Sequence, residues 1–278
     1  MDLEKYEKEK NNVEHKHKKK FGQNFLDDKI LLEKIKEVTN ISVNDNIIEI
    51  GPGIGFLTSM ILESGAKLKS FEIDNDLIPV LNKKFGNYEN FELIHVDFLL
   101  YNLENIMEKG KEYRVIANIP YYITAPIINK LLEFKDNIKD IYLMVQKEVG
   151  ERLNFEKNTS NKGVFTHVVG FHSKVEYLFT VEKEFFDPIP KVDSAFIRIN
   201  IDKEEKYSKM ISFEKYLKYV KASFASKRKS ISNNLKTIGI SKDITENALV
   251  FIGKNNNSRA EELSIEDFIA LINIIEKG

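Results

Sequence analysis

The chain has 278 residues, of which 42% are apolar, so it can bury the core of one large domain or of one domain with a small appendage. It contains no cysteine, which excludes disulfides, thiolate metal sites and a cysteine nucleophile. The formal net charge of −1 gives no global argument for nucleic-acid binding, and no apolar run is long enough to cross a membrane.

The first part of the chain is strongly charged. Residues 1–20 mix lysine with glutamate and lack an apolar stretch, so we expect a disordered tail rather than a secretory signal or a transit peptide. Together with the absence of cysteine, this composition favours a cytoplasmic protein. The five histidines form no tight group of ligands, and we therefore expect no metal site.

Strands and helices alternate over the following part of the chain. A helix is expected over 28–39, capped by Asp27 or Asp28. Strands are predicted at 46–51, 67–73, 91–96, 113–118 and 139–146, and helices at 55–64, 76–85, 100–109 and 125–134. This alternation predicts an α/β fold, in which helices cover both faces of a parallel sheet.

The pattern changes after this region. Segments 173–182 and 194–201 are predicted to be a closing pair of strands, separated by a proline-bearing loop. A charged linker then leads into a lysine-rich helical region that runs from 212 to the end. We therefore predict a main domain over 21–202 and a small helical domain over 203–278.

A glycine turn follows the first predicted strand of the sheet. Gly51, Gly53 and Gly55 form a G-x-G-x-G pattern that opens a helix, and in open α/β sheets ligands bind at such carboxyl ends of strands. Phe56 stands where the dinucleotide fingerprint has its third glycine, and no Lys-Ser or Lys-Thr pair follows. The turn therefore gives little support to a pyrophosphate ligand.

Acidic residues end the next two strands. Glu72 lies about twenty residues beyond the glycine turn, where a carboxylate suits the two hydroxyls of a ribose. Asp97 could accept from an adenine amino group while Phe98 packs nearby. Each acid alone is more typical of a turn or cap. In series with Asn118 they outline a crevice for adenosine, which indicates S-adenosylmethionine, a nucleoside with a sulfonium and no phosphate.

The tetrapeptide Asn118-Ile119-Pro120-Tyr121 ends an apolar strand. The side-chain carbonyl of Asn118 and a backbone carbonyl near Pro120 can accept from the amino group of a nucleobase, because proline donates no hydrogen bond of its own. Tyr121 can stack on the base, as pockets for extruded bases commonly arrange. The alternative is a strand followed by a simple proline turn.

A basic run stands out in the helical region. Lys227, Arg228 and Lys229 lie together, and Arg228 is one of only five arginines in the chain. This run predicts contacts with RNA phosphates, although such runs are usually just a solvated face.

Together these motifs closely resemble the small-subunit ribosomal RNA adenine dimethyltransferases, from about Lys19 to near the C-terminus. The motifs that carry the resemblance are Phe21-Gly22-Gln23-Asn24-Phe25-Leu26, the Gly51 turn, Asn118-Ile119-Pro120-Tyr121, Gln146-Lys147-Glu148-Val149, Pro190-Lys191-Val192-Asp193-Ser194-Ala195, Phe224-Ala225 with Arg228-Lys229, and Arg259-Ala260-Glu261-Glu262-Leu263. The resemblance implies a Rossmann-like S-adenosylmethionine-dependent methyltransferase sheet with helices on both faces, plus a small C-terminal helical domain that binds RNA or the ribosome.

The resemblance also implies roles for individual residues. Cofactor contacts are expected at Asn24, Leu26, Gly51, Glu72, Asp97 and Asn118. The target adenine is expected to meet Asn118 and Tyr121, with Phe186 as a second aromatic wall. The chain departs from many bacterial relatives at Tyr122, where they have asparagine.

Family members transfer four methyl groups to two adjacent adenosines near the 3′ end of the small-subunit RNA, and they act on a maturing particle. The expected partner is therefore small-subunit ribosomal RNA within an immature small ribosomal subunit, bound by a monomeric enzyme with no membrane association.

Other functions remain to be weighed. A large-subunit RNA adenine methyltransferase of the antibiotic-resistance type shares the tetrapeptide, but the Pro190–Ala195 and Arg259–Leu263 motifs favour the small-subunit branch. A non-catalytic RNA-binding or transcription-factor relative would be favoured by loss of Asn118, Tyr121 or Glu72, and all three are present. A nicotinamide oxidoreductase is disfavoured by the glycine spacing.

Overall fold

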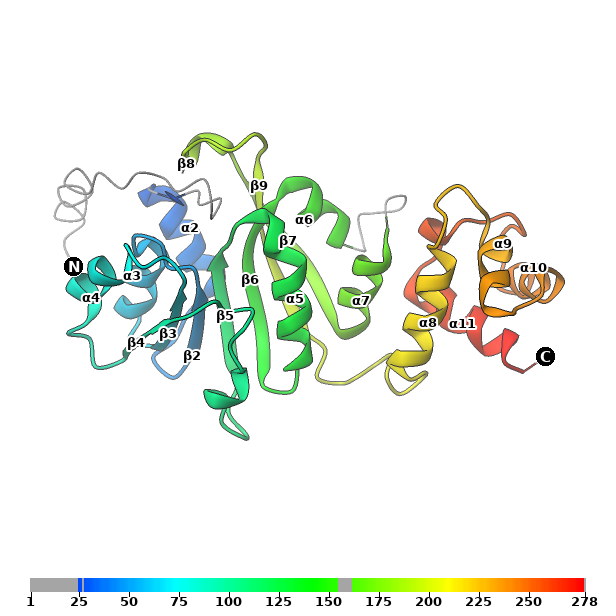
Figure 1. Cartoon of the computed structure of the whole chain (residues 1–278), viewed down its shortest axis with the longest axis horizontal. Coiled ribbons are helices and arrows are strands. Elements are labelled where there is room, and N and C mark those ends of the chain that lie inside the picture. The colour runs from blue at the N-terminus through cyan, green and yellow to red at the C-terminus, as the bar shows by residue number, and fades with distance from the viewer. Residues whose placement is uncertain (1–24, 27, 155–161, 278) are drawn as a thin grey trace. The chain divides into compact units, whose positions relative to one another are not determined.

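A computed structural model of the protein describes residues 25–26, 28–154 and 162–277 (Figure 1). Its strands are β1 (Phe25–Leu26), β2 (Asn46–Ile50), β3 (Lys67–Glu72), β4 (Phe91–His95), β5 (Tyr113–Asn118), β6 (Ile138–Gln146), β7 (Ser173–Val181), β8 (Phe186–Asp187) and β9 (Ser194–Ile201). Its α-helices are α2 (Lys29–Thr39), α3 (Phe56–Glu63), α4 (Ile78–Phe85), α5 (Thr124–Glu133), α6 (Lys147–Leu153), α7 (Val164–His172), α8 (Phe213–Ser223), α9 (Ile231–Leu235), α10 (Lys242–Phe251) and α11 (Ile265–Ile275).

Seven strands form one sheet in the order β4-β3-β2-β5-β6-β9-β7. The pairs β3–β4, β2–β3, β2–β5 and β5–β6 are parallel, which confirms the predicted α/β fold. The predicted closing strands are the neighbours β9 and β7 at one edge. Since the chain runs from β2 outward to β4 and then returns to β5, the strand order reverses between β2 and β5, which is where such folds bind ligands.

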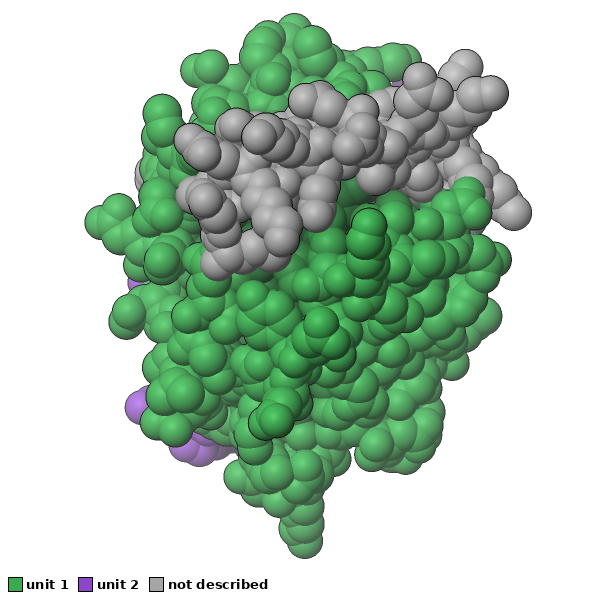
Figure 2. Space-filling model, turned by 90° about the vertical axis from the view of Figure 1, so that its left-hand side faces the viewer, with its two compact units in different colours: residues 1–150, 176–199 green, residues 151–175, 200–278 purple. Residues whose placement is uncertain are grey.

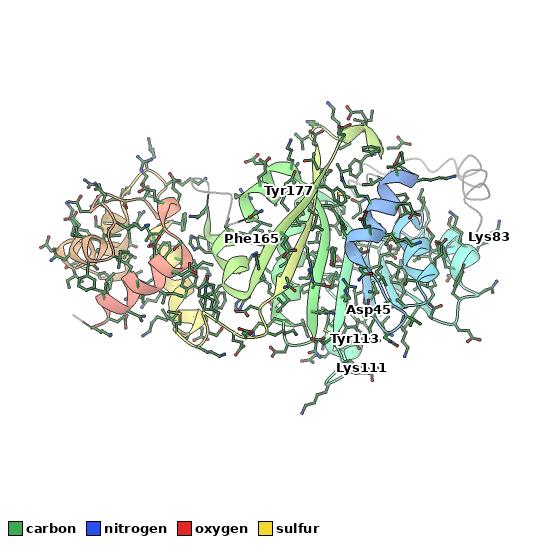
Figure 3. All side chains as sticks on the ribbon, turned by 180° about the vertical axis from the view of Figure 1, so that it is seen from behind. Asp45, Lys83, Lys111, Tyr113, Phe165 and Tyr177 are labelled. Atoms are coloured by element: carbon green, nitrogen blue, oxygen red, sulfur yellow. The ribbon has the colours of Figure 1, made fainter. Side chains whose placement is uncertain are left out.

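Helices cover both faces of this sheet. Figure 1 shows α5 in front of it, and Figure 3, seen from behind, shows α2 on the opposite face. The fully buried Ile35 of α2 and Ile61 of α3 belong to one hydrophobic core with Tyr142 of β6. Ile127 and Leu131 of α5 are also fully buried. Asp28 caps α2 by accepting from the Leu31 amide at 2.8 Å, as one of the two predicted caps.

A close approach fixes the turn that leads from β2 into α3. Gly55 precedes α3 with φ of 93°, and a Cβ built on it would lie 2.3 Å from Cε2 of Phe85. Phe85 is itself 1% exposed, with its ring 5.8 Å from that of Phe91. Only glycine fits this backbone conformation beside a ring that is held in the core.

The predicted helix over 100–109 is wrong. The structure has only a short 3₁₀ turn, η1 (Leu103–Asn105), in this segment. Asn102 accepts from the Glu104 amide at 3.1 Å, and this local bond favours a turn over a helix. Leu103 and Ile106 are buried while Leu100 is 82% exposed, so the buried side chains of this segment are too few to support a helix of ten residues.

At the amino ends of the strands, charged groups are buried together. The Arg114 guanidinium binds Asp140 at 2.8 Å, Asp45 at 2.9 Å and the Thr39 carbonyl at 2.8 Å. Figure 3 labels Asp45 at this edge of the sheet. Because each charge has a partner, the cluster joins α2, β5 and β6 without an isolated buried ion.

The chain forms two compact units, residues 1–150 with 176–199 and residues 151–175 with 200–278 (Figure 2). The second unit contains the C-terminal helices, and serine caps α8, α9, α10 and α11. It also includes α7, because Phe171 packs 4.7 Å from the ring of Tyr216 and His167 bonds the hydroxyl of Tyr216 at 2.7 Å. Among the described residues, none of the helices is long and apolar enough to span a membrane.

Candidate functional site

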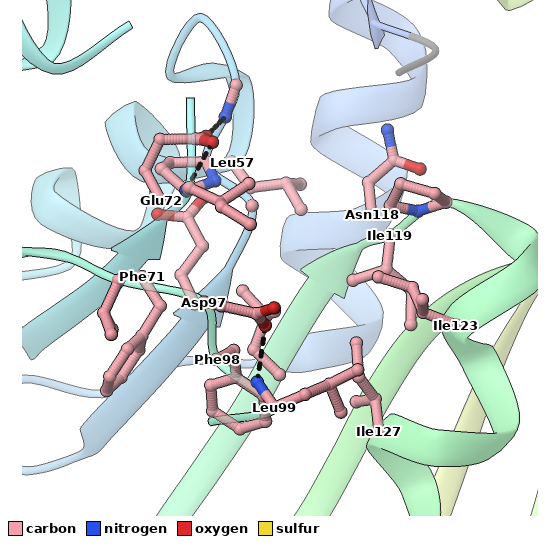
Figure 4. Close-up of a pocket in the computed structure, with 18 of the residues that line it drawn as sticks. Leu57, Phe71, Glu72, Asp97, Phe98, Leu99, Asn118, Ile119, Ile123 and Ile127 are labelled. Carbon is pink, nitrogen blue, oxygen red and sulfur yellow. Dashed lines mark hydrogen bonds between the residues drawn. The ribbon is translucent and has the colours of Figure 1, made fainter. Parts of the chain in front are cut away.

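A cavity of about 340 Å³ opens at the carboxyl ends of β2, β3, β4 and β5 in the first unit (Figure 4). These four strands are neighbours in the sheet, so segments distant in sequence meet at one edge. Its lining consists of Glu49, Ile50, Gly51, Pro52, Gly53, Ile54, Phe56, Leu57, Phe71, Glu72, Ile73, Val96, Asp97, Phe98, Leu99, Asn118, Ile119, Pro120, Tyr122, Ile123 and Ile127. The predicted residues Gly51, Glu72, Asp97 and Asn118 are therefore brought together.

Gly51 and Asn118 lie on either side of the point where the strand order reverses. Gly51 has φ of 69°, and a Cβ there would lie 3.9 Å from the backbone oxygen of Asn118. The Gly51 amide donates to the Phe71 carbonyl at 2.9 Å, which continues the pairing of β2 with β3. The absence of a side chain keeps the mouth open for a ligand between the two strands.

The Glu72 carboxylate is held in place by backbone amides. It is 2% exposed, and its Oε1 accepts from the amides of Ile73 and Asp74, both at 2.8 Å. Its Oε2 accepts a longer bond, at 3.3 Å, from Gly53 in the glycine turn (Figure 4). Burial raises the pKa of Glu72, and the three amides act in the opposite direction. Oε2 thus keeps the greater capacity to accept from a ligand hydroxyl.

Asp74 belongs to the turn after β3, because its Oδ1 accepts from the Asp76 amide at 3.0 Å. Asp97 lines the cavity, and its Oδ1 accepts from the Leu99 amide at 2.9 Å (Figure 4). Next to it, the buried Phe98 meets Phe71 edge to face, with ring centroids 5.2 Å apart. A carboxylate beside an apolar wall suits a flat ring that carries an amino group.

From Asn118 to Tyr122 the chain lines the cavity except at Tyr121. Half-buried Asn118 and Pro120 line the cavity, and so does Tyr122, which is 68% exposed. Tyr121 is not among the described residues that line it. Its hydroxyl lies 2.6 Å from that of Ser194, and burial raises its pKa while this bond acts the other way. Tyr121 would have to turn or be approached from outside the cavity to stack on a base.

Phe186 is also absent from the described lining. It is 3% exposed and belongs to the hydrophobic core of the first unit. The backbone of β8 pairs with β1, where Leu26 faces Phe186. Thus a residue predicted to contact the cofactor and one predicted to contact the target base occupy paired backbone positions. Asn24 lies outside the described residues.

The sequence reasoning missed Glu49. This residue is 1% exposed and lines the cavity, and its Oε2 accepts from Thr58 at 2.8 Å and from Ser70 at 2.6 Å. Its Oε1 has no hydrogen-bond partner among the described residues. Burial raises the pKa of Glu49 to about 7. The signal was a carboxylate inside an otherwise apolar strand, two residues before the glycine turn.

The predicted basic run lies in the second unit. Lys227, Arg228 and Lys229 are exposed in the turn between α8 and α9. The buried Asn234 donates to the carbonyls of Ser223 at 2.6 Å and Ser226 at 3.0 Å, which holds the start of this turn. The three exposed cations therefore lie in a turn whose first residues are hydrogen-bonded to α9.

The cavity suits a nucleoside whose ribose meets Glu72 and whose base meets Asp97 and Phe98. Apolar side chains from α3 and α5, Leu57 and Ile127, complete its wall (Figure 4). No group of three or more histidines, cysteines or acids within the described ranges could hold a metal ion. The side-chain amide of Asn118 also lines this cavity, beside the place that the nucleoside would occupy.

Comparison with known proteins identifies related sequences over nearly the whole chain. Residues 14–277 match the family described as Ribosomal RNA adenine dimethylase. A protein of Fusobacterium nucleatum subsp. nucleatum named Ribosomal RNA small subunit methyltransferase A is 51% identical over 265 residues, which cover 95% of this chain and 99% of that protein. A protein of the same name from Clostridium botulinum (strain Kyoto / Type A2) is 40% identical over 258 residues, 93% of this chain and 94% of its own length.

Two solved structures share the fold. The 23S rRNA methyltransferase ErmE has a TM-score of 0.74 and 24% sequence identity, and the match covers 91% of this chain and 100% of that one. A dimethyladenosine transferase from Plasmodium falciparum has a TM-score of 0.73 and 24% identity, with 91% of this chain and 98% of that one covered.

Proposed function

The chain belongs to the ribosomal RNA adenine dimethylase family, and we propose that it dimethylates the N6 amines of two adjacent adenosines near the 3′ end of small-subunit ribosomal RNA. S-adenosylmethionine supplies the activated methyl groups when it is bound. The observation that carries the proposal is the convergence of Glu72, Asp97 and Asn118 on one cavity at the strand-order reversal.

In this proposal the cofactor residues hold an adenosine. Glu72 accepts from the ribose hydroxyls, and Asp97 with Phe98 receives the adenine ring. Gly51 leaves room for the ligand between β2 and β5. The fit is supported by the carboxylate of Glu72, whose backbone partners fix it before any ligand arrives. Asn24 and Leu26 are proposed as further cofactor contacts.

The target amine is oriented by acceptors. The side-chain carbonyl of Asn118 and the neighbouring backbone carbonyl engage its N–H groups, so that the nitrogen lone pair points at the methyl carbon. No strong general base is required, because S-adenosylmethionine, when bound, would supply a methyl group that leaves a neutral thioether behind, and the methylated amine would lose its proton to water. Positioning and electrostatics therefore supply most of the acceleration. Tyr121 and Phe186 are proposed to sandwich the base after they leave the positions described above.

The substrate particle and the cellular setting are part of the same proposal. Residues 21–202 act as the catalytic domain, residues 203–278 bind RNA or the ribosome, and Lys227, Arg228 and Lys229 contact phosphates. The enzyme acts as a monomer in the cytoplasm on an immature small subunit. The names of the relatives at 51% and 40% identity support this branch.

Methyl transfer to two substrates side by side tests the proposal. One is small-subunit particles from cells that lack the dimethylation, and the other is protein-free large-subunit RNA. Label from S-adenosylmethionine should appear at paired adenosines of the small-subunit particle, mapped by reverse-transcriptase stops. Label only on large-subunit RNA would move the protein to the resistance branch, and label on neither would support a non-catalytic RNA-binding role.

A further inference from the structure

The segment that carries Asp97 is a loop between β4 and η1, and hydrogen bonds from outside the loop hold it in place. After β4 the chain forms turns in which the amides of Leu100 and Tyr101 both bond the Asp97 carbonyl, at 3.0 and 3.2 Å. No helix follows until η1. The backbone carbonyls of this loop therefore lack the repeated partners that a helix would provide. We refer to residues 97–101 as the adenine loop.

One side chain supplies those partners from another element. The Nζ atom of Lys130, on α5, donates to the carbonyl of Leu99 at 2.8 Å and to that of Tyr101 at 2.6 Å. The same Nζ lies 5.5 Å from the ring centroid of Phe98. Lys130 thus makes charge-assisted hydrogen bonds to the backbone on both sides of residue 100. It also makes a cation–π contact with the aromatic wall of the cavity.

Lys130 also lies in an element that starts at the substrate side. Helix α5 begins at Thr124, directly after the 3₁₀ helix η2 (Tyr121–Ile123), and its Ile127 lines the cavity (Figure 4). Partial burial lowers the pKa of Lys130, while Glu133 and Asp97 act in the opposite direction. Lys130 therefore connects helix α5, which follows the proposed target-base residues, to the adenine loop, which carries the proposed cofactor contact Asp97.

We infer that Lys130 is a positioning residue that holds the adenine loop, so that Asp97 and Phe98 meet the adenine of the cofactor in one fixed arrangement. This inference rests on the proposed placement of the cofactor, and it concerns adenine recognition rather than methyl transfer itself. Its signature is selectivity for adenine, because Asp97 can accept from an amino group that hypoxanthine lacks.

The test measures binding of S-adenosylhomocysteine and of S-inosylhomocysteine, its hypoxanthine analogue, by calorimetry on the full chain. The wild type should prefer the adenine ligand. Lys130→Met should weaken the binding of S-adenosylhomocysteine by about tenfold, the effect of losing a charge-assisted hydrogen bond. It should also remove most of the preference for the adenine ligand over the hypoxanthine ligand. Lys130→Arg, which keeps a donor with similar reach, should retain it.

Two control variants separate this role from general loosening. Lys84 donates to the Ile54 carbonyl at 3.1 Å in the glycine turn. Lys84→Met should therefore weaken the binding of both ligands by the same factor. Lys83→Met alters an exposed neighbour and should change neither. If Lys130→Met weakened both ligands to the same degree, or left the preference intact, the inference would be overturned.

The remaining outcomes are also distinguishable. If Lys130→Met does not fold, Lys130→Gln, which retains an N–H donor but no charge, should fold with an intermediate preference, and an unchanged preference there would count against the role. Failure of the wild type to bind S-adenosylhomocysteine would instead remove the proposed function on which the inference rests.

Discussion

The hydroxyl of Tyr121 lies 2.6 Å from that of Ser194, the first residue of β9, which is fully buried. This bond ties the segment after β5 to a strand more than seventy residues later in the chain, since the two residues are 73 positions apart. The half-buried aromatic ring that the sequence assigned to base stacking is therefore held through its hydroxyl by a distant strand.

We expect Tyr121→Phe and Ser194→Ala each to lower the free energy of unfolding by about 1 kcal/mol, because each leaves the remaining hydroxyl of this partly buried bond without its partner. The double variant should lose no more than the larger single loss. Urea titrations of all four proteins measure this cycle, and strictly additive losses would show that the two hydroxyls do not interact in solution.

Asn118→Ala should reduce kcat by about 100-fold or more, because an acceptor is lost at the reacting amine. The dissociation constant for RNA should change little, since the backbone and the basic run remain. Asn118→Asp keeps a side-chain acceptor and should retain more turnover than the alanine variant. Single-turnover methylation with a parallel RNA-binding measurement checks this, and a pure affinity loss would contradict the assigned role.

Tyr122 is the exposed aromatic residue at the cavity mouth. Tyr122→Ala should weaken RNA binding by about tenfold if a base stacks on the ring, because such stacking contributes about 1–3 kcal/mol. Tyr122→Phe should bind as the wild type does. Fluorescence anisotropy with a short hairpin RNA measures both, and equal binding of the alanine variant would assign the ring no part in RNA contact.

Glu49 should make the stability of the protein depend on pH. Its pKa is raised from 4.5 to about 7 in the folded protein, so between these values the unfolded chain releases a proton that the folded protein retains. Stability should therefore fall as pH rises through this window, by about 3 kcal/mol in total, and level off above it. Unfolding by urea at pH 5 and pH 8, without cofactor, measures the fall.

Glu49→Gln should abolish most of this pH-dependent difference, because the amide does not titrate. Glu37→Gln, a change at an exposed position of α2, serves as the matched control and should leave the difference in place. A Glu49→Gln profile parallel to that of the wild type would show that other groups cause the dependence.

The basic run should contribute to the salt dependence of RNA binding. Changing Lys227, Arg228 and Lys229 together to glutamine should reduce the slope of log K against log salt by about 2, as expected for the loss of three phosphate contacts. The control changes three exposed lysines of the first unit, Lys36, Lys83 and Lys139. Equal slopes for the two triple variants would remove the specific role of the run.

The periodicity of apolar residues located most of the strands and of the helices that cover the sheet. The predicted end of β5 is confirmed at Asn118, which interrupts an apolar run, and β3 ends at Glu72, one residue before the predicted end. The segment around Asn102 was misjudged, because a side-chain bond to the Glu104 amide decides its conformation and leaves no mark on the apolar pattern. Local hydrogen bonding of this kind competes with helix formation without changing composition.

The cavity residues were found where a polar group ends a strand, since parallel strands deliver those groups to one edge. The sequence could not show that Phe186 is buried or that the Tyr121 hydroxyl bonds Ser194, because both depend on residues that are distant in the chain. Nor could it reveal Lys130, whose contacts at Leu99 and Tyr101 are with backbone atoms and depend on no particular residue type there.

The contact between Gly55 and Phe85 has a consequence for how this protein can change over generations. A side chain at position 55 would both strain a φ of 93° and lie 2.3 Å from the ring of Phe85, which is 1% exposed. A library that varies residue 55 and is screened for folded protein should therefore retain only glycine at this position. Gly110, with a similar φ of 81° but nothing within 4 Å of a built Cβ, should drift to asparagine or aspartate. Two glycines with similar backbone angles would thus differ in their tolerance to substitution.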